Sequence, residues 1–161
     1  MPVVGTKLHV PAARRQLVPR PRLTDQLWAD SRSMPRLVLI AAPAGFGKTT
    51  FLTQWLATAD SRRSEKSLRV GWLSLDEGDS DLSRFLAHVV AALRATDSRL
   101  GVEALAWMDA DRGFSADEVL VSMVNHLDTT ADPTVLAFDD YHVIDASAVH
   151  DAVAFLLDNL P

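Results

Sequence analysis

The chain has 161 residues, enough for one domain with a substantial core, and its 48% hydrophobic and 23% charged residues are ordinary values for a globular protein. A net charge of −5 argues against a free-standing nucleic-acid binder, because such proteins usually present a basic face to phosphate. No apolar run reaches the roughly 18 residues of a membrane-spanning helix, no secretory signal is recognisable, and the lack of cysteine excludes disulfides and thiolate sites, so a cytoplasmic protein is expected.

The first 33 residues are predicted to form an N-terminal arm and a short helix. Residues 1–21 are rich in proline and arginine and show little periodicity, which is typical of an extended segment. Thr24 is the predicted N-cap of a helix that runs to about residue 33, before Pro35. The arginines of this region are interpreted as a solvated face, with the alternative that part of the cluster faces phosphate. They are Arg14, Arg15, Arg20, Arg22, Arg32 and Arg36.

Residues 34–161 are predicted to form one domain in which strands alternate with helices. Apolar runs predict strands at residues 36–41 (RLVLIA), 69–75 (RVGWLSL) and 134–138 (TVLAF), the first and third of the kind that is covered on both faces. Helical periodicity predicts helices at residues 48–59, 82–95 and 147–159, and a further helix that opens at Ser115, which has capping-box spacing with Glu118. The alternation indicates βαβ units and therefore an α/β fold with a parallel sheet between helices.

The segment between the first strand and its helix, APAGFGKTT (residues 42–50), is predicted to bind phosphate. It follows the pattern G-x-x-x-x-G-K-[ST] of the P-loop, or Walker A motif, with Ala42 in place of the first glycine. Gly45 and Gly47 allow backbone conformations that point successive N–H groups inward, and the following helix adds its N-terminal dipole. Lys48 is expected to reach the β- and γ-phosphates, and the Thr49 hydroxyl to ligate Mg²⁺. The remaining loop residues expected at the phosphates are Ala44, Phe46 and Thr50.

A second acidic element follows the third strand, where the sequence reads VLAFDD. P-loop proteins place a carboxylate at the end of an apolar strand beside the Mg²⁺ ion, so Asp139 is the predicted metal ligand. Asp140 is the candidate general base that orients or deprotonates the attacking water. Asp76 and Glu77 end the second strand in the same way. They are kept as candidates for contacting the metal ligands rather than the metal itself. His142 is open to two interpretations, a sensor of the γ-phosphate or, preferably, a hydrogen-bonded structural histidine.

Four stretches in this order resemble the nucleotide-binding domain of the MalT-like, large LuxR-family transcriptional regulators. They are residues 6–23 (TKLHVPAARRQLVPRPRL), 42–50, 69–81 (RVGWLSLDEGDSD) and 135–144 (VLAFDDYHVI). These regulators belong to the STAND signal-transduction ATPases, in the P-loop class that includes AAA+ relatives. The resemblance covers essentially the whole chain, and an alanine at position 42 is unexceptional in that family.

The resemblance implies a three-layer, parallel-sheet P-loop NTPase of the AAA+/STAND type that acts as an ATP-driven switch. It implies ATP and Mg²⁺ as cofactors, with Lys48 and Thr49 at the phosphates and the metal, Asp139 at the metal and Asp140 at the hydrolytic water. Arg20 lies in the element that, by the family pattern, is near the nucleotide base. Slow ATP hydrolysis at most is expected from the isolated chain, and the case for adenine rests on the resemblance.

Relatives continue with another strand, further helical domains and a DNA-binding helix-turn-helix. The chain is therefore expected to be a C-terminally incomplete form that contacts neither DNA nor a membrane. In the implied fold the next strand lies between the first and third, so its absence predicts unpaired sheet edges and a tendency to associate.

Two other functions are left open. One is a P-loop kinase for a small molecule, against which stands the lack of an arginine-rich lid after the second or third strand. The other is a non-enzymatic fragment that associates with itself or with a full-length regulator.

Overall fold

The computed structural model describes residues 3–12, 20–28, 35–61, 67–99, 115–130 and 132–160. The chain divides into two compact units. The sheet unit comprises Met1–His9 and Leu68–Pro161, and the loop unit comprises Val10–Ser67. The predicted boundary between an arm and a nucleotide-binding domain at residues 33 and 34 stays a prediction.

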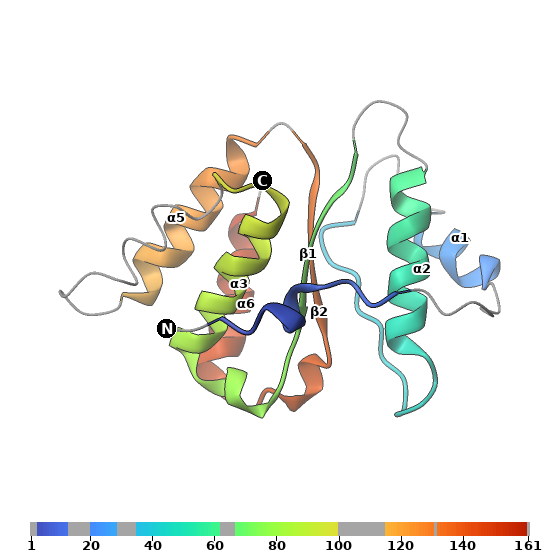
Figure 1. Cartoon of the computed structure of the whole chain (residues 1–161), viewed down its shortest axis with the longest axis horizontal. Helices are drawn as coiled ribbons and strands as arrows, with labels where there is room; N and C mark the ends of the chain where they lie inside the picture. The colour runs from blue at the N-terminus through green and yellow to red at the C-terminus, as the bar shows by residue number, and fades with distance from the viewer. Residues whose placement is uncertain are drawn as a thin grey trace. The chain divides into compact units, whose positions relative to one another are not determined.

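The sheet unit is built on two parallel strands, β1 (Arg69–Ser74) and β2 (Thr134–Asp139). They pair from Arg69 opposite Thr134 to Ser74 opposite Asp139, so their carboxyl ends meet at one edge of the sheet. Figure 1 shows helices α3 (Leu82–Thr96), α5 (Ala116–Asp128) and α6 (Ser147–Asn159) gathered on one side of these strands. Parallel strands with helices packed on them confirm the α/β prediction for this part of the chain.

The core of the sheet unit forms because the apolar stripes of the three helices face one another and β1. Close approach of α3 to β1 is possible at Gly71, where a Cβ atom would lie 3.1 Å from the carbonyl oxygen of Ala92. The best-buried members of the core are Leu73, Phe85, Leu86, Val89, Val90, Ala92, Val119 and Val149. No helix in the described ranges is long and apolar enough to cross a bilayer.

Within the described residues, the sheet unit also contains three short 3-10 helices. The segment η1 (Gly5–Leu8) contacts β1 and α3, although the residues of the loop unit separate it from both elements in the sequence. The predicted acidic turn after β1 is η2 (Glu77–Ser80), which is capped by Asp76, and the turn after β2 is η3 (Tyr141–Val143).

The loop unit contains α1 (Pro21–Trp28) and α2 (Lys48–Ser61). The prediction that Thr24 caps the first helix is wrong, because the helix already begins at Pro21, which is well suited to a first helical position. Thr24 lies in the first turn, where its hydroxyl donates to the carbonyl of Pro21 at 2.9 Å. The predicted end of this helix near residue 33 lies outside the described residues.

The prediction of a strand at residues 36–41 is also wrong. Residues 37–41 have no strand assignment, and the prediction of a segment covered on both faces is wrong, since Leu37 is 59% and Leu39 81% exposed. Apolar residues supply material for a strand, but a strand exists only when a neighbour accepts its backbone hydrogen bonds.

The other predicted elements are confirmed to within one or two residues at their ends. The Ser115 hydroxyl accepts a hydrogen bond from the Glu118 N–H at 3.4 Å, as the predicted cap requires. Residues 100–114, between α3 and α5, lie outside the described residues.

Candidate nucleotide-binding site

The predicted phosphate loop is a compact turn that leads directly into α2. Gly45 has φ of +81° and Gly47 has φ of +80°, backbone conformations that side chains oppose. The Phe46 N–H donates to the Pro43 carbonyl at 3.4 Å, which closes the turn between the two glycines and the preceding segment. Both glycines are therefore required for the reason that the sequence predicts.

Helix α2 begins where the loop ends. The Gly47 carbonyl accepts the first helical hydrogen bond, from the Phe51 N–H at 2.9 Å. The first turn of a helix presents N–H groups that the helix itself cannot satisfy, together with a positive dipole end. Lys48, Thr49 and Thr50 form that turn, so an anion at the loop would meet backbone donors from all three.

The Lys48 side chain folds back over the loop rather than extending into solvent. Its ammonium donates to the carbonyls of Ala42 at 3.0 Å and of Pro43 at 3.4 Å. These bonds join the two ends of the loop and hold a positive charge beside the turn formed by the glycines. The geometry thus places a cation beside a turn with two glycines in the left-handed conformation, at the start of a helix, which suits a polyphosphate.

Arg20 is brought to the loop from a distant part of the sequence. Its Nη2 atom lies 3.9 Å from the position that a Cβ atom would take at Gly47. The Arg20 carbonyl accepts hydrogen bonds from the N–H groups of Leu23 at 3.0 Å and Thr24 at 3.2 Å, which fixes the residue at the start of α1. A second cation is therefore present beside the loop, while the contact of Arg20 with a nucleotide base stays a prediction.

The two predicted acids lie in the sheet unit, at the carboxyl end of β2. Asp139 is buried, with 9% exposure, and its carbonyl accepts a hydrogen bond from the Leu75 N–H at 3.0 Å. Asp140 has φ of 59° and ψ of 31°, the left-handed conformation, and is the single non-glycine residue with positive φ in the described ranges. In open α/β sheets, ligands bind at the carboxyl ends of the strands, which is where this pair lies.

The turn that follows Asp140 is held by its own contacts. The Asp140 carbonyl accepts a hydrogen bond from the Val143 N–H at 3.1 Å. The Tyr141 ring stacks on Phe138 with 6.1 Å between ring centroids, and its hydroxyl bonds to His150 Nδ1 at 2.7 Å. Burial raises the pKa of Tyr141, so this hydroxyl stays neutral. The side chain of His142 is exposed, with Nδ1 3.8 Å from Asp140 Oδ1.

Asp76, one of the two competing acids after β1, is engaged elsewhere. Asp76 forms an ion pair with Lys7 at 2.7 Å, and sequence reasoning missed this lysine together with Asp79 and His88, which join the same cluster. Within the described ranges no group of three or more metal-binding side chains stands together. The spacing of Asp76 and Asp79 matches a capping box and was the one local signal for a structural role of these acids.

Comparison with known proteins agrees with the geometry of the loop. The sequence profile of the AAA ATPase domain family matches residues 19–161. The chain belongs to this family. Membership implies a P-loop α/β fold and a domain that binds a nucleotide, usually with Mg²⁺.

Relatives with two different names are similar to the chain over nearly its whole length. The HTH-type transcriptional regulator MalT of Klebsiella pneumoniae subsp. pneumoniae is 32% identical over 159 residues, which is 99% of this chain and 16% of the relative. The serine/threonine-protein kinase PknK of Mycobacterium tuberculosis is 35% identical over 159 residues, or 98% of this chain and 14% of the relative. MalT of Yersinia pestis is 34% identical over 161 residues. The chain therefore spans about one sixth of the length of these relatives, and the match confirms the resemblance to the nucleotide-binding domain of MalT-like proteins.

Proposed function

We propose that the chain binds MgATP at residues 45–50. The observation that carries this proposal is the loop itself, in which two glycines with positive φ precede a helix whose first residue, Lys48, holds its ammonium against the loop carbonyls. Backbone N–H groups of the loop and of the first turn of α2 would bind the phosphates, and Lys48 would turn from the carbonyls to the β- and γ-phosphates. The hydroxyl of Thr49 would ligate Mg²⁺, which supplies charge neutralisation of the triphosphate.

Asp139 is proposed to hold the metal and Asp140 to orient or deprotonate the attacking water. Support comes from their place at the carboxyl end of β2 and from the left-handed backbone of Asp140, a conformation that is found preferentially at functional positions. Hydrolysis by this chain is expected to be slow, as in a switch that a nucleotide sets and hydrolysis resets.

The cellular role that we propose is that of the nucleotide-dependent switch module of a MalT-like transcriptional regulator. Regulators and a protein kinase among the relatives share this segment with the chain, which supports a module whose output depends on what it is joined to. In this proposal the complete domain is a three-layer P-loop NTPase of the STAND type, working in the cytoplasm, and DNA is contacted by another part of the regulator.

Calorimetric titration of the chain with MgATP tests the proposal. Lys48→Ala removes charge-assisted hydrogen bonds worth about 1.5–3 kcal/mol, so Kd should rise by roughly 10- to 150-fold. Thr49→Ser should retain the affinity for MgATP, whereas Thr49→Val should lose the difference between binding with and without Mg²⁺. Equal affinity of the Lys48→Ala variant and the parent chain would refute the proposal, and phosphate transfer to a metabolite would favour the kinase alternative.

A second candidate function, association with another copy or with a full-length regulator, is favoured by the exposure of residues 37–41. Leu37 and Leu39 present apolar side chains on a segment that has no strand partner in the described ranges. Size-exclusion chromatography with light scattering at several concentrations should show mass increasing with concentration, and Leu39→Lys should suppress the increase.

A further inference from the structure

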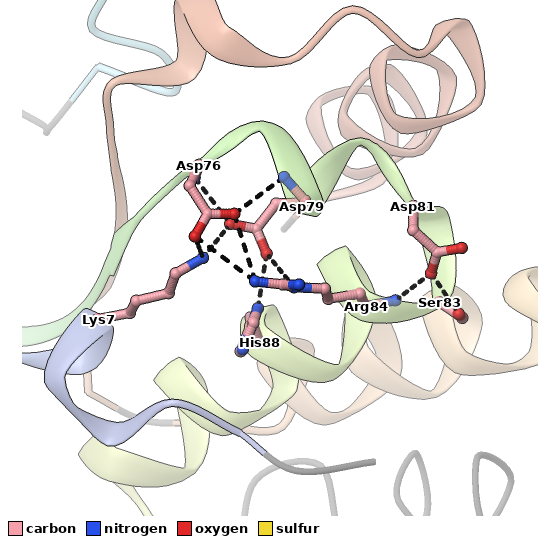
Figure 2. Close-up of polar contacts among 8 residues, drawn as sticks. Lys7, Asp76, Asp79, Asp81, Ser83, Arg84 and His88 are labelled. Atoms are coloured by element: carbon pink, nitrogen blue, oxygen red, sulfur yellow. Dashed lines mark hydrogen bonds and ion pairs between the residues drawn. The ribbon is translucent and has the colours of Figure 1, made fainter.

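A cluster of charged side chains, centred on the buried Asp79, ties the N-terminal segment (residues 3–9) to the turn after β1. The Lys7 ammonium lies 2.7 Å from Asp76 Oδ2 and 2.5 Å from Asp79 Oδ2, although 72 residues separate Lys7 from Asp79. Figure 2 shows Lys7 entering the cluster from η1, with Arg84 and His88 of α3 directed at the same carboxylates. Two chain segments, η1 and α3, therefore converge on the pair of acids in the turn after β1.

The carboxylate of Asp79 is the centre of this cluster. It is fully buried and accepts hydrogen bonds from Lys7, from the Asp76 N–H at 2.9 Å and from His88 Nδ1 at 2.7 Å. Burial raises the pKa of Asp79, but these donors outweigh burial and hold the pKa below its usual value. A buried carboxylate in this state needs its cationic partners, and Lys7, with a side chain only 12% exposed, is the one supplied from outside the local sequence.

Arg84 completes the charge balance on the exposed side. Its guanidinium lies against the turn at Gly78, where a Cβ atom would come within 2.6 Å of Nη1, and it contacts Asp76 at 3.3 Å and Asp79 at 3.4 Å. With Lys7 and Arg84 facing Asp76 and Asp79, the charges of the cluster are matched. The turn η2 is thus held from the N-terminal segment on one side and from α3 on the other.

The same turn supports the loop that carries Asp140. The Ser80 hydroxyl of η2 accepts a hydrogen bond from the Asp145 N–H at 3.3 Å, and the Leu75 N–H just before η2 donates to the Asp139 carbonyl at 3.0 Å. Between these two bonds lies the η3 turn, whose neighbour Ile144 is buried in the core. Displacement of η2 would therefore act on both ends of residues 139–145.

We infer that Lys7 is a positioning residue for the acidic pair Asp139 and Asp140. By binding Asp76 and Asp79, the N-terminal segment fixes η2, and η2 in turn fixes residues 139–145. The N-terminal segment therefore helps to hold the acidic pair in position. The structural part of this inference stands independently, while its consequence for nucleotide binding rests on the proposed function.

Hydrogen exchange of the full chain tests the structural part without a nucleotide. Lys7→Met removes the charge and keeps the length of the side chain, so exchange should accelerate in residues 76–81 and in residues 141–145, where the Val143, Ile144 and Asp145 amides are hydrogen-bonded. Helix α6 should stay protected. Arg99→Met is the matched control, because it removes an ion pair with an 80% exposed arginine far from this turn in the sequence.

The inference is supported if Lys7→Met accelerates hydrogen exchange in residues 141–145 while Lys7→Arg leaves these residues protected. It is overturned if exchange rises only in residues 3–9, or if α6 loses protection equally, since Lys7 would then serve general stability. Calorimetry provides the functional arm: Lys7→Met should reduce the gain in ATP affinity that Mg²⁺ provides by about three- to ten-fold and leave metal-free binding unchanged. Lack of ATP binding by the parent chain would refute the proposed function, and the exchange result would still decide the role of Lys7.

Discussion

Two acids that share one lysine but differ in burial allow the energetics of the cluster to be tested directly. Asp79 has a side chain with 0% exposure, whereas the side chain of Asp76 is 53% exposed, and both contact Lys7. Breaking a buried ion pair by removing one partner costs about 3–5 kcal/mol, because the other charge stays behind unpaired. Exposed pairs contribute about 0–1 kcal/mol. Burial, and not the number of contacts, should therefore decide which substitution is damaging.

Asp79→Asn should cost about 3 kcal/mol, the low end of the range, since the amide oxygen can still accept one hydrogen bond and Asp76 still faces Lys7. Asp76→Asn should cost about 1 kcal/mol or less, because asparagine also caps a helical turn well. For a chain of this length, Tm should fall by roughly 6–12 °C in Asp79→Asn and by at most about 4 °C in Asp76→Asn.

Thermal and urea unfolding followed by circular dichroism would measure both variants, with the urea midpoint compared at constant slope. The double variant Lys7→Met, Asp79→Asn sharpens the test. Because it removes the buried acid together with the cation that contacts it, its cost should fall short of the sum of the single costs. Equal destabilisation by the two single substitutions, or strict additivity in the double variant, would refute the reasoning from burial.

Three further outcomes are expected. Gly47→Ala should cost about 1–2 kcal/mol of stability and weaken MgATP binding, because alanine opposes the positive φ. Gly5→Ala should be neutral in both measurements, because φ is not positive there and no atom lies within 4 Å of the added Cβ. Since the folded pKa of Asp79 is below its ordinary value of 3.8, its contribution to stability is present above that pH and is lost as the pH falls through the folded pKa. Urea midpoints across acidic pH should thus fall more steeply for the parent than for Asp79→Asn. Asp140→Gly should raise stability by up to about 1 kcal/mol and abolish ATP hydrolysis, while Asp140→Asn should abolish hydrolysis with little change in stability.

Local patterns in the sequence were sufficient for most helices. The apolar stripe of α3 and the cap at Ser115 depend on residues within a few positions of one another, so the sequence alone predicts them. Strand formation depends on distant partners. The runs that form β1 and β2 pair with each other, whereas the equally apolar residues 36–41 have no strand partner in the described ranges. Composition alone could not distinguish these cases.

The site divides in the same way between local and distant signals. Residues 42–50 carry their chemistry in consecutive positions, so the turn and the start of the helix at Lys48 could both be predicted. The contact of Lys7 with Asp79 spans 72 residues and leaves no periodic trace, and the approach of Arg20 to Gly47 could be expected only from family resemblance. Charged pairs that close long loops are seen only when the chain is folded.

Left-handed backbone conformations occur in both motifs that have a proposed role at the nucleotide. In the described ranges, positive φ occurs at Gly45, Gly47 and Asp140, and each of these lies in a motif with a proposed role at the nucleotide. The glycines adopt this conformation at little cost, but an aspartate in it carries strain that the surrounding contacts must offset. Here the offset is visible in the η3 turn, which the Val143 N–H closes on the Asp140 carbonyl, and in the Tyr141 ring that anchors the turn on Phe138. A glycine at position 140 would relieve the strain, so an aspartate in this conformation agrees with the role proposed for its carboxylate.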